Sequence, residues 1–147
     1  MLHSMFKKLH VDYIYFLLFF VCFLVILAYG HYRCVSGQKD FLQYPLFPKY
    51  KHLHDLDGWS GSHFLFYMVI GMLYPKSFYL TITFGIMWEC FEFFVAKYQP
   101  IWLQDFGFCG TRVMTDKPVT IWWYGKVSDL LVNFFGFIVG HYLVTAS

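Results

Sequence analysis

The sequence predicts an all-α membrane protein, a bundle of four transmembrane helices with two long loops on one side. Two observations lead to this fold class. Hydrophobic residues make up 59% of the 147-residue chain and charged residues 14%, whereas soluble domains average roughly 45–50% and about 25%. The apolar residues also gather in four segments close to the length of a membrane span. The chain, residues 1–147, has the length of one domain and not of two.

The first segment, residues 13–30, carries no charged residue. A helix needs about 20 apolar residues to cross a hydrocarbon core about 30 Å thick. Lys7 and Lys8 precede the segment, as basic residues do in a signal peptide, but no small-residue cleavage motif follows it. We therefore expect a retained membrane span.

The second and third segments, residues 58–74 and 77–96, are joined by Pro75-Lys76. A link this short makes the two helices antiparallel neighbours. The second segment is short for a span, so we expect it to be tilted or partly interfacial. The fourth segment, residues 121–146, follows a loop that contains several Gly and Pro residues. Four spans place both termini and the 75–76 turn on one side of the membrane, and both long loops on the other.

Two observations bear on which side the long loops face. Eight of the eleven Lys and Arg residues lie on the loop side, and the excess of positive charge in cytoplasmic loops would make these loops cytoplasmic. Cys34 and Cys109 lie in the two loops, and a disulfide between them is an open alternative if that side is oxidising. Cys22 and Cys90 lie in apolar segments and are expected to be packing thiols.

Five polar residues interrupt the apolar segments at similar depths. Glu89 and Glu92 lie about 10 and 6 Å inside the loop end of the third segment, on one helix face. Asp129 lies about 12 Å inside the fourth segment, with Asn133 one turn further along the same face. His63 lies about 8 Å inside the second segment. We therefore expect side chains from three segments to meet in one pocket near one leaflet surface.

The carboxylates of this cluster suggest a metal site. An isolated carboxylate costs about 2.5 kcal/mol or more in lipid, and three together repel one another and take up protons unless a cation lies between them. Oxygen ligands without thiolates suit Ca²⁺, Mg²⁺ or Mn²⁺, so the predicted metal ligands are Glu89, Glu92 and Asp129. The alternative is a purely structural cluster, in which the glutamates are protonated or pair with His63 or Lys126.

Three further residues are candidates for the site. Asp57 lies at the mouth of the second segment, about 9 Å from His63 along a helix. Trp122 and Trp123 belong either to an interfacial aromatic belt or to a surface on which a substrate stacks. The basic residues are scattered along the chain, so no nucleic-acid partner is expected.

Residues 55–143 carry four short motifs: Asp57-x5-His63-Phe64, Trp88-Glu89-x-x-Glu92, Trp122-Trp123-x5-Asp129-Leu-Leu, and Asn133 with Gly136. Their order and most of their spacings resemble the core of the eukaryotic-type phosphatidylserine synthases, which are base-exchange enzymes. The resemblance implies a multi-pass enzyme of an endomembrane, such as the endoplasmic reticulum in a eukaryotic or viral context. It also implies that the enzyme exchanges the head group of phosphatidylcholine or phosphatidylethanolamine for serine, with Ca²⁺.

The same resemblance implies roles for individual residues. The metal is served by Glu89, Glu92 and Asp129, and the catalytic candidates are His63, Asp57 and Asn133. His63 is the candidate general base for the serine hydroxyl, and the paired tryptophans are the candidate substrate contacts. The expected partners are membrane phospholipids and serine or another amino alcohol, with a homo-oligomer as an open alternative.

Asp129, Asn133, Gly136 and Gly140 also fit the pattern Asp-x3-Asn-x2-Gly-x3-Gly, which closes the VanZ-like small membrane proteins. This looser resemblance implies a non-enzymatic protein of lipid-binding or assembly type. The two glycines form a Gly-x-x-x-Gly pattern, which is typical of close helix packing. A third class, an ion or proton pathway, is less favoured because the polar residues gather at one end of the bundle.

Overall fold

The structure, a computed structural model, describes residues 12–37, 39–109, 120–121 and 123–146. Its helices are α2 (Tyr13–Ser36), α3 (Gly58–Leu73), α4 (Phe78–Tyr98) and α5 (Val127–Thr145). Short 3-10 turns form η1 (Phe41–Gln43), η2 (Lys51–Leu53) and η3 (Ile101–Leu103). Strands β1 (Phe108–Cys109) and β2 (Thr120–Ile121) pair antiparallel. The protein is therefore mostly helical, with one small strand pair that the all-α prediction did not include.

Three of these helices, α2, α4 and α5, are long and apolar enough to cross a membrane, and the protein is a multi-pass membrane protein. α3 has 16 residues, which cover about 24 Å, less than the hydrocarbon core of about 30 Å. The predicted four-span bundle is thus supported for three spans. The segment predicted over residues 58–74 is the short one.

Two of the helices begin at aspartate caps. Asp12 accepts two backbone N–H groups in the first turn of α2, and Asp57 accepts the Ser60 N–H at 3.1 Å at the start of α3. α2 ends at Gly37, whose φ of 64° is the left-handed conformation that glycine adopts readily. This stop signal lies beyond the predicted range 13–30, and α2 accordingly ends at Ser36.

α5 begins at Val127, and the prediction that the fourth helix begins at residue 121 is wrong. Residues 123–126 are not helical and pass against α4, where a Cβ on Gly125 would lie 2.5 Å from the Glu89 carbonyl oxygen. Glycine therefore permits a backbone contact between this segment and α4. The Lys126 N–H donates to Glu89 Oε2 at 2.9 Å, so the chain is held by α4 before α5 starts.

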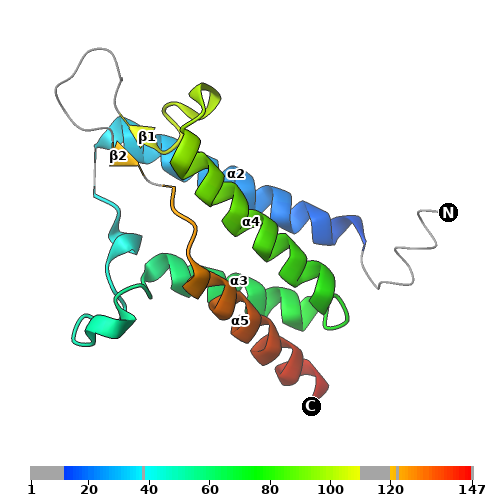
Figure 1. The fold of residues 1–147 in the computed structure, drawn as a ribbon. Coiled ribbons are helices and arrows are strands. Elements are labelled where there is room, and N and C mark those ends of the chain that lie inside the picture. The colour runs from blue at the N-terminus through cyan, green and yellow to red at the C-terminus, as the bar shows by residue number, and fades with distance from the viewer. Residues whose placement is uncertain (1–11, 38, 110–119, 122, 147) are drawn as a thin grey trace.

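α3 and α5 pack at backbone distance, and they run beside each other in Figure 1. A Cβ on Gly136 would lie 2.5 Å from the Phe64 carbonyl oxygen. A Cβ on Gly140 would overlap the Met68 backbone. The close packing that the Gly-x-x-x-Gly pattern predicts is confirmed.

Buried apolar side chains form two clusters. One joins α2, α3 and α5 through Tyr15, Tyr67, Ile70 and Phe137. The other joins α4 to the segments at the loop end through Val95, Leu103, Phe108 and Trp123. The second cluster is a separate hydrophobic core at the loop end, so the segments that follow α4 are packed against the helix.

The segments that follow α2 and α4 lie at the same end of the bundle (Figure 1). A disulfide joins Cys34, near the end of α2, to Cys109 of β1, which answers the open question of their pairing. Asp40 braces the same end, because it accepts hydrogen bonds from the Tyr29 hydroxyl and Trp59 Nε1, each at 2.9 Å. The loop end is therefore tied to both α2 and α3.

Candidate functional site

A compact polar group lies at the loop end of three helices. It consists of His63 on α3, Glu89 on α4 and Asp129 on α5, and one ligand atom from each lies within 4.8 Å of the others. Glu89 is 6% exposed and Asp129 is 2% exposed. His63 Nδ1 lies 3.7 Å from Glu89 Oε1. We refer to these three residues as the polar trio.

The two carboxylate oxygens of Glu89 differ in their surroundings. Oε2 accepts the backbone N–H of Lys126 at 2.9 Å. Oε1 is buried and has no hydrogen-bond partner within the described part of the chain. A buried acceptor without a donor costs about 1–3 kcal/mol, and more when it is charged. A cation, a proton or a water is therefore needed to satisfy this oxygen.

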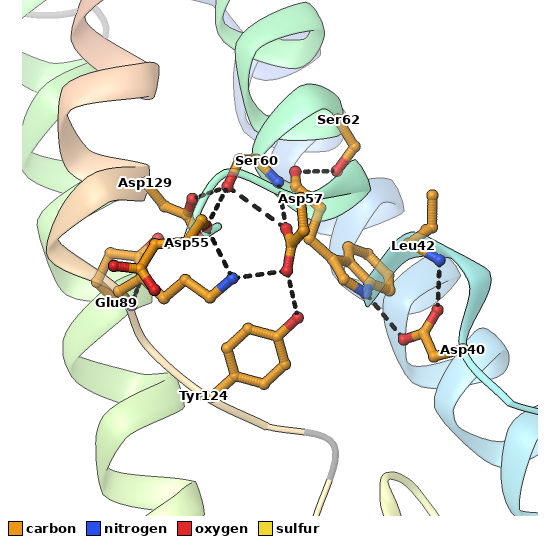
Figure 2. A network of polar contacts seen from close by, with 11 residues as sticks. Asp40, Leu42, Asp55, Asp57, Ser60, Ser62, Glu89, Tyr124 and Asp129 are labelled. Atoms are coloured by element: carbon orange, nitrogen blue, oxygen red, sulfur yellow. Dashed lines mark hydrogen bonds and ion pairs between the residues drawn. The ribbon is translucent and has the colours of Figure 1, made fainter. Parts of the chain in front are cut away.

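Asp129 lies in the first turn of α5, whereas the sequence suggested a position about 12 Å inside a helix. Its Oδ1 accepts a hydrogen bond from Ser60 Oγ of α3, drawn in Figure 2. A carboxylate in the first turn also interacts favourably with the positive end of the helix dipole. The late start of α5 thus brings the helix N-terminus, together with its carboxylate, to the polar trio.

His63 is oriented by Asn133. His63 Nδ1 lies 3.0 Å from Asn133 Oδ1, and Asn133 is 1% exposed. Because an amide oxygen only accepts hydrogen bonds, this contact places the proton of a neutral imidazole on Nδ1 and the lone pair on Nε2. Asn133 therefore holds a histidine whose second nitrogen can accept a proton.

Glu92 lies beside the polar trio and not within it. With Trp59, His63, Tyr124 and Asp129 it lines a cavity of about 20 Å³. A cavity of about 10–15 Å³ is enough for one water molecule, so this one has room for a water or a single small cation. The polar trio thus contains two of the three predicted metal ligands, Glu89 and Asp129, together with His63. The third, Glu92, lines the adjoining cavity.

Asp57 is 3% exposed and is held by structural contacts (Figure 2). Its Oδ2 accepts hydrogen bonds from Lys126 Nζ at 2.6 Å and from the Tyr124 hydroxyl at 3.0 Å. Burial and the nearby Asp57 carboxylate raise the pKa of Tyr124. Asp57 therefore links the start of α3 to the segment before α5, and the catalytic role that the family resemblance implies for it stays a prediction.

Sequence reasoning missed Ser60 and Tyr124, and it considered Lys126 only as a partner in a structural cluster. Ser60 lies three residues after Asp57 and three before His63, and this helical spacing was the signal that could have found it. Tyr124 and Lys126 lie in a segment without helical periodicity, so no comparable signal exists for them.

Of the two paired tryptophans, the structure describes only Trp123, and its side chain is buried. Trp122 lies outside the described residues. Trp123 is 1% exposed and packs with Val95 and Leu103. Its Nε1 donates to the Phe106 carbonyl oxygen at 2.8 Å. This location differs from both predicted roles, the interfacial belt and the stacking surface, because the ring lies in a protein core.

The fold and the site together define a class, a multi-pass helical membrane protein with a buried carboxylate and histidine site at one end of its helices. The chain matches no protein-family model, no curated protein and no solved structure. The geometry of the site and the motifs of the sequence are therefore what indicate its function.

Proposed function

We propose that the protein is a membrane-embedded phospholipid head-group exchange enzyme, similar to the phosphatidylserine synthases, that uses a divalent cation. The observation that carries the proposal is the polar trio, in which a buried Glu89 oxygen lacks a hydrogen-bond partner among the described residues. The substrates are a membrane phospholipid and serine or another amino alcohol. The order of the motifs over residues 55–143 supports the same family.

The carboxylates of Glu89 and Asp129 suit a divalent cation. Oxygen ligands lie about 2.3–2.6 Å from Ca²⁺, so two ligand atoms on opposite sides of one ion are about 5 Å apart. One oxygen of Glu89 and one oxygen of Asp129 lie within 4.8 Å of each other, and Glu92 lines the adjoining cavity. When bound, Ca²⁺ (or Mg²⁺ or Mn²⁺) would neutralise charge on the phosphate oxygens and polarise the phosphorus.

His63 is the residue that moves the proton in this proposal. Its Nε2 takes the proton of the attacking hydroxyl while the hydroxyl oxygen forms a bond to phosphorus. The bond from phosphorus to the leaving head-group oxygen breaks, and the proton on Nε2 passes to that oxygen. One alcohol replaces another, so neither an oxidant nor a reductant is consumed. Asn133 Oδ1 accepts the hydrogen bond from the His63 Nδ1–H group throughout.

The disulfide supports a site that faces an oxidising compartment. Cys34 and Cys109 are joined at the loop end, and disulfides are rare where glutathione keeps thiols reduced. The distribution of Lys and Arg favours the opposite orientation, but a charge bias is a weaker constraint than a covalent bond between the two loop segments. The proposed location of the site is therefore the lumenal or extracellular side, with an endomembrane such as the endoplasmic reticulum as the membrane.

Reconstitution tests the exchange activity. Purified protein in phosphatidylcholine vesicles, supplied with Ca²⁺ and labelled serine, ethanolamine or choline, should form a labelled phospholipid. Glu89→Gln and Asp129→Asn should lower the rate by about 100-fold or more, because even groups that only support metal ligands are worth 10–100-fold. If the folded protein exchanges none of these head groups, the proposal is refuted.

Asp105→Asn is the matched control for these two variants. Asp105 is exposed and lies at the loop end outside the polar trio. Its φ of 66° is a backbone conformation that asparagine tolerates as well as aspartate does. The control should therefore keep the wild-type exchange rate, and a matching loss in the control would show that the site variants act through general damage.

A cation series separates two roles of His63. Oxygen-only ligation favours Ca²⁺ or Mg²⁺, whereas a site that includes an imidazole nitrogen favours ions such as Mn²⁺ or Zn²⁺. Activity with Ca²⁺ supports His63 as the base. Activity confined to transition metals would make His63 a ligand and would show the base assignment to be wrong.

The VanZ-like alternative, a non-enzymatic lipid-binding or assembly protein, is favoured by one observation. The Ser60–Asp129 and Asp57–Lys126 contacts tie helices and segments together without any ligand. In that case Asp129→Asn should reduce stability or expression, and added cations should leave the melting temperature unchanged. An enzyme with a metal site should instead remain folded after this substitution and lose its cation-induced stabilisation.

A further inference from the structure

A cleft of about 510 Å³ lies between α2, α3 and α4, next to the polar trio. Most of its lining side chains are aromatic or aliphatic. The proposed reaction gives a role to the polar residues at one end of the cleft, His63 and Glu92. It gives no role to the apolar side chains that line the rest.

The cleft has one polar end and one apolar end. His63 and Glu92 line it at the loop end. At the other end Phe84 closes it with Phe19 and Phe66, and the Phe19 ring centroid lies 5.0 and 5.1 Å from those of Phe84 and Phe66. The eight residue steps from Phe84 to Glu92 rise about 12 Å, most of the roughly 15 Å that one leaflet contributes to the hydrocarbon core. The cleft therefore follows one leaflet from head-group depth toward the bilayer centre.

The cleft opens sideways, toward lipid. Three of its lining side chains are largely exposed, with Phe20 at 57%, Val25 at 62% and Met87 at 60%. Phe20 and Val25 belong to α2 and Met87 to α4, so the opening lies between these two helices. A lipid can reach the polar end through this opening without leaving the bilayer.

We propose that the cleft binds one acyl chain of the membrane lipid whose head group lies at the polar trio. Three residues, Trp59, His63 and Glu92, line both the cleft and the small polar cavity. A molecule that fills both spaces has a polar head and an apolar tail, joined at head-group depth. The inference rests on the proposed function for the identity of the head group, and on the cleft alone for the chain.

The size and lining of the cleft suit an acyl chain. Its volume of about 510 Å³ is about 25 times that of the small polar cavity beside it, which has room for a water molecule. The second chain of a diacyl lipid would remain in the bilayer at the opening. An apolar partner helix would leave the polar end of the cleft, at His63 and Glu92, without an occupant that matches it.

Photo-crosslinking tests where the chain lies. Vesicles should contain phosphatidylcholine with a diazirine near the end of one acyl chain, and the labelled peptides should be mapped by mass spectrometry. We expect the label on the deep residues Phe66 and Phe84. Label confined to the outer face of α2, at Leu17, Val21 and Leu24, would overturn the inference, because these exposed residues meet any surrounding lipid.

The two free cysteines offer a matched pair of variants. Cys22 lines the cleft, whereas Cys90 is exposed on α4 and does not line it. Cys22→Trp fills the cleft and should reduce acyl-chain labelling and raise the KM for lipid by about tenfold, while Cys90→Trp changes neither. If Cys22→Trp does not fold, Val25→Trp narrows the opening and serves the same purpose. Equal labelling of the filled and control variants would overturn the inference.

The two proposals fail in different ways. Deep labelling that Cys22→Trp abolishes, without any head-group exchange, leaves the acyl-chain site in place and refutes the exchange activity. Head-group exchange that is insensitive to Cys22→Trp, with label only on outer surfaces, retains the activity and refutes the acyl-chain site.

Discussion

Gly136→Ala tests whether the close packing of α3 on α5 sets the geometry of the polar trio. The new Cβ would lie 2.5 Å from the Phe64 carbonyl oxygen and 3.2 Å from the Phe64 carbonyl carbon. Ordinary contacts of a Cβ begin near 3.4 Å, so the two helices would have to separate locally by about 0.9 Å, the kind of backbone shift that overpacking produces. Phe64 follows His63 in α3, and Gly136 lies one turn after Asn133 in α5.

The hydrogen bond between His63 and Asn133 should therefore break. Its length of 3.0 Å would grow to about 3.9 Å, beyond hydrogen-bonding distance. Overpacking costs about 1–3 kcal/mol, and the lost hydrogen bond adds about 0.5–1.5 kcal/mol. We expect a lower melting temperature in detergent, measured by tryptophan fluorescence. We also expect a loss of head-group exchange in vesicles.

Gly61→Ala is the control in the same helix. A Cβ there would meet only Leu46 Cδ1, at 3.7 Å, an ordinary contact, and alanine is favoured over glycine within a helix by about 0.5–1 kcal/mol. This variant should match or exceed the wild-type melting temperature. If Gly136→Ala behaves like Gly61→Ala in both assays, the helices do not pack as closely as described and the reasoning is refuted.

Four further predictions concern the segment before α5 and the loop end. Gly125→Ala should push this segment away from α4, because the Cβ would lie 2.5 Å from the Glu89 carbonyl oxygen. The hydrogen bond from the Lys126 N–H to Glu89 is then lost, and calorimetry should show weaker Ca²⁺ binding. Unchanged binding would contradict the geometry. Lys126→Met should lower the free energy of unfolding by about 1–3 kcal/mol, since the buried Asp57 carboxylate loses its cation but keeps the hydrogen bond from Tyr124. Chemical unfolding of the double variant with Asp57→Asn should show part of this loss recovered, and strictly additive losses would argue against the ion pair. Without reductant, a maleimide reagent should label two of the four cysteines of the denatured protein, and all four after reduction. A glycosylation acceptor placed within residues 39–50 should be modified in microsomes. An unmodified acceptor would place the loops in the cytoplasm.

The helical segments and the convergence of polar residues follow from regular features of the sequence. Charge-free apolar runs mark the helices, and a helix rises about 1.5 Å per residue, so the depth of His63 or Glu89 follows from its distance to a loop. The start of α5 does not follow in this way. The run that contains Trp123 is as apolar as a helix, yet residues 123–126 are not helical and the Trp123 ring fills a core. Apolar composition does not distinguish these cases.

Taken alone, the sequence determined a helical, multi-pass membrane protein with acidic residues and a histidine at one depth of neighbouring helices. Only the tertiary structure decided which atoms meet: the Glu89 oxygen to which no described residue donates, the pairing of Asp57 with Lys126, the bond between Cys34 and Cys109, and the cleft beside α2. The physical reason is that helix geometry relates residues that are close together in the chain, so it can be predicted from the sequence. Contacts such as that of His63 with Asn133, 70 residues apart, depend on how closely whole helices pack, and in this protein glycine backbones set that distance.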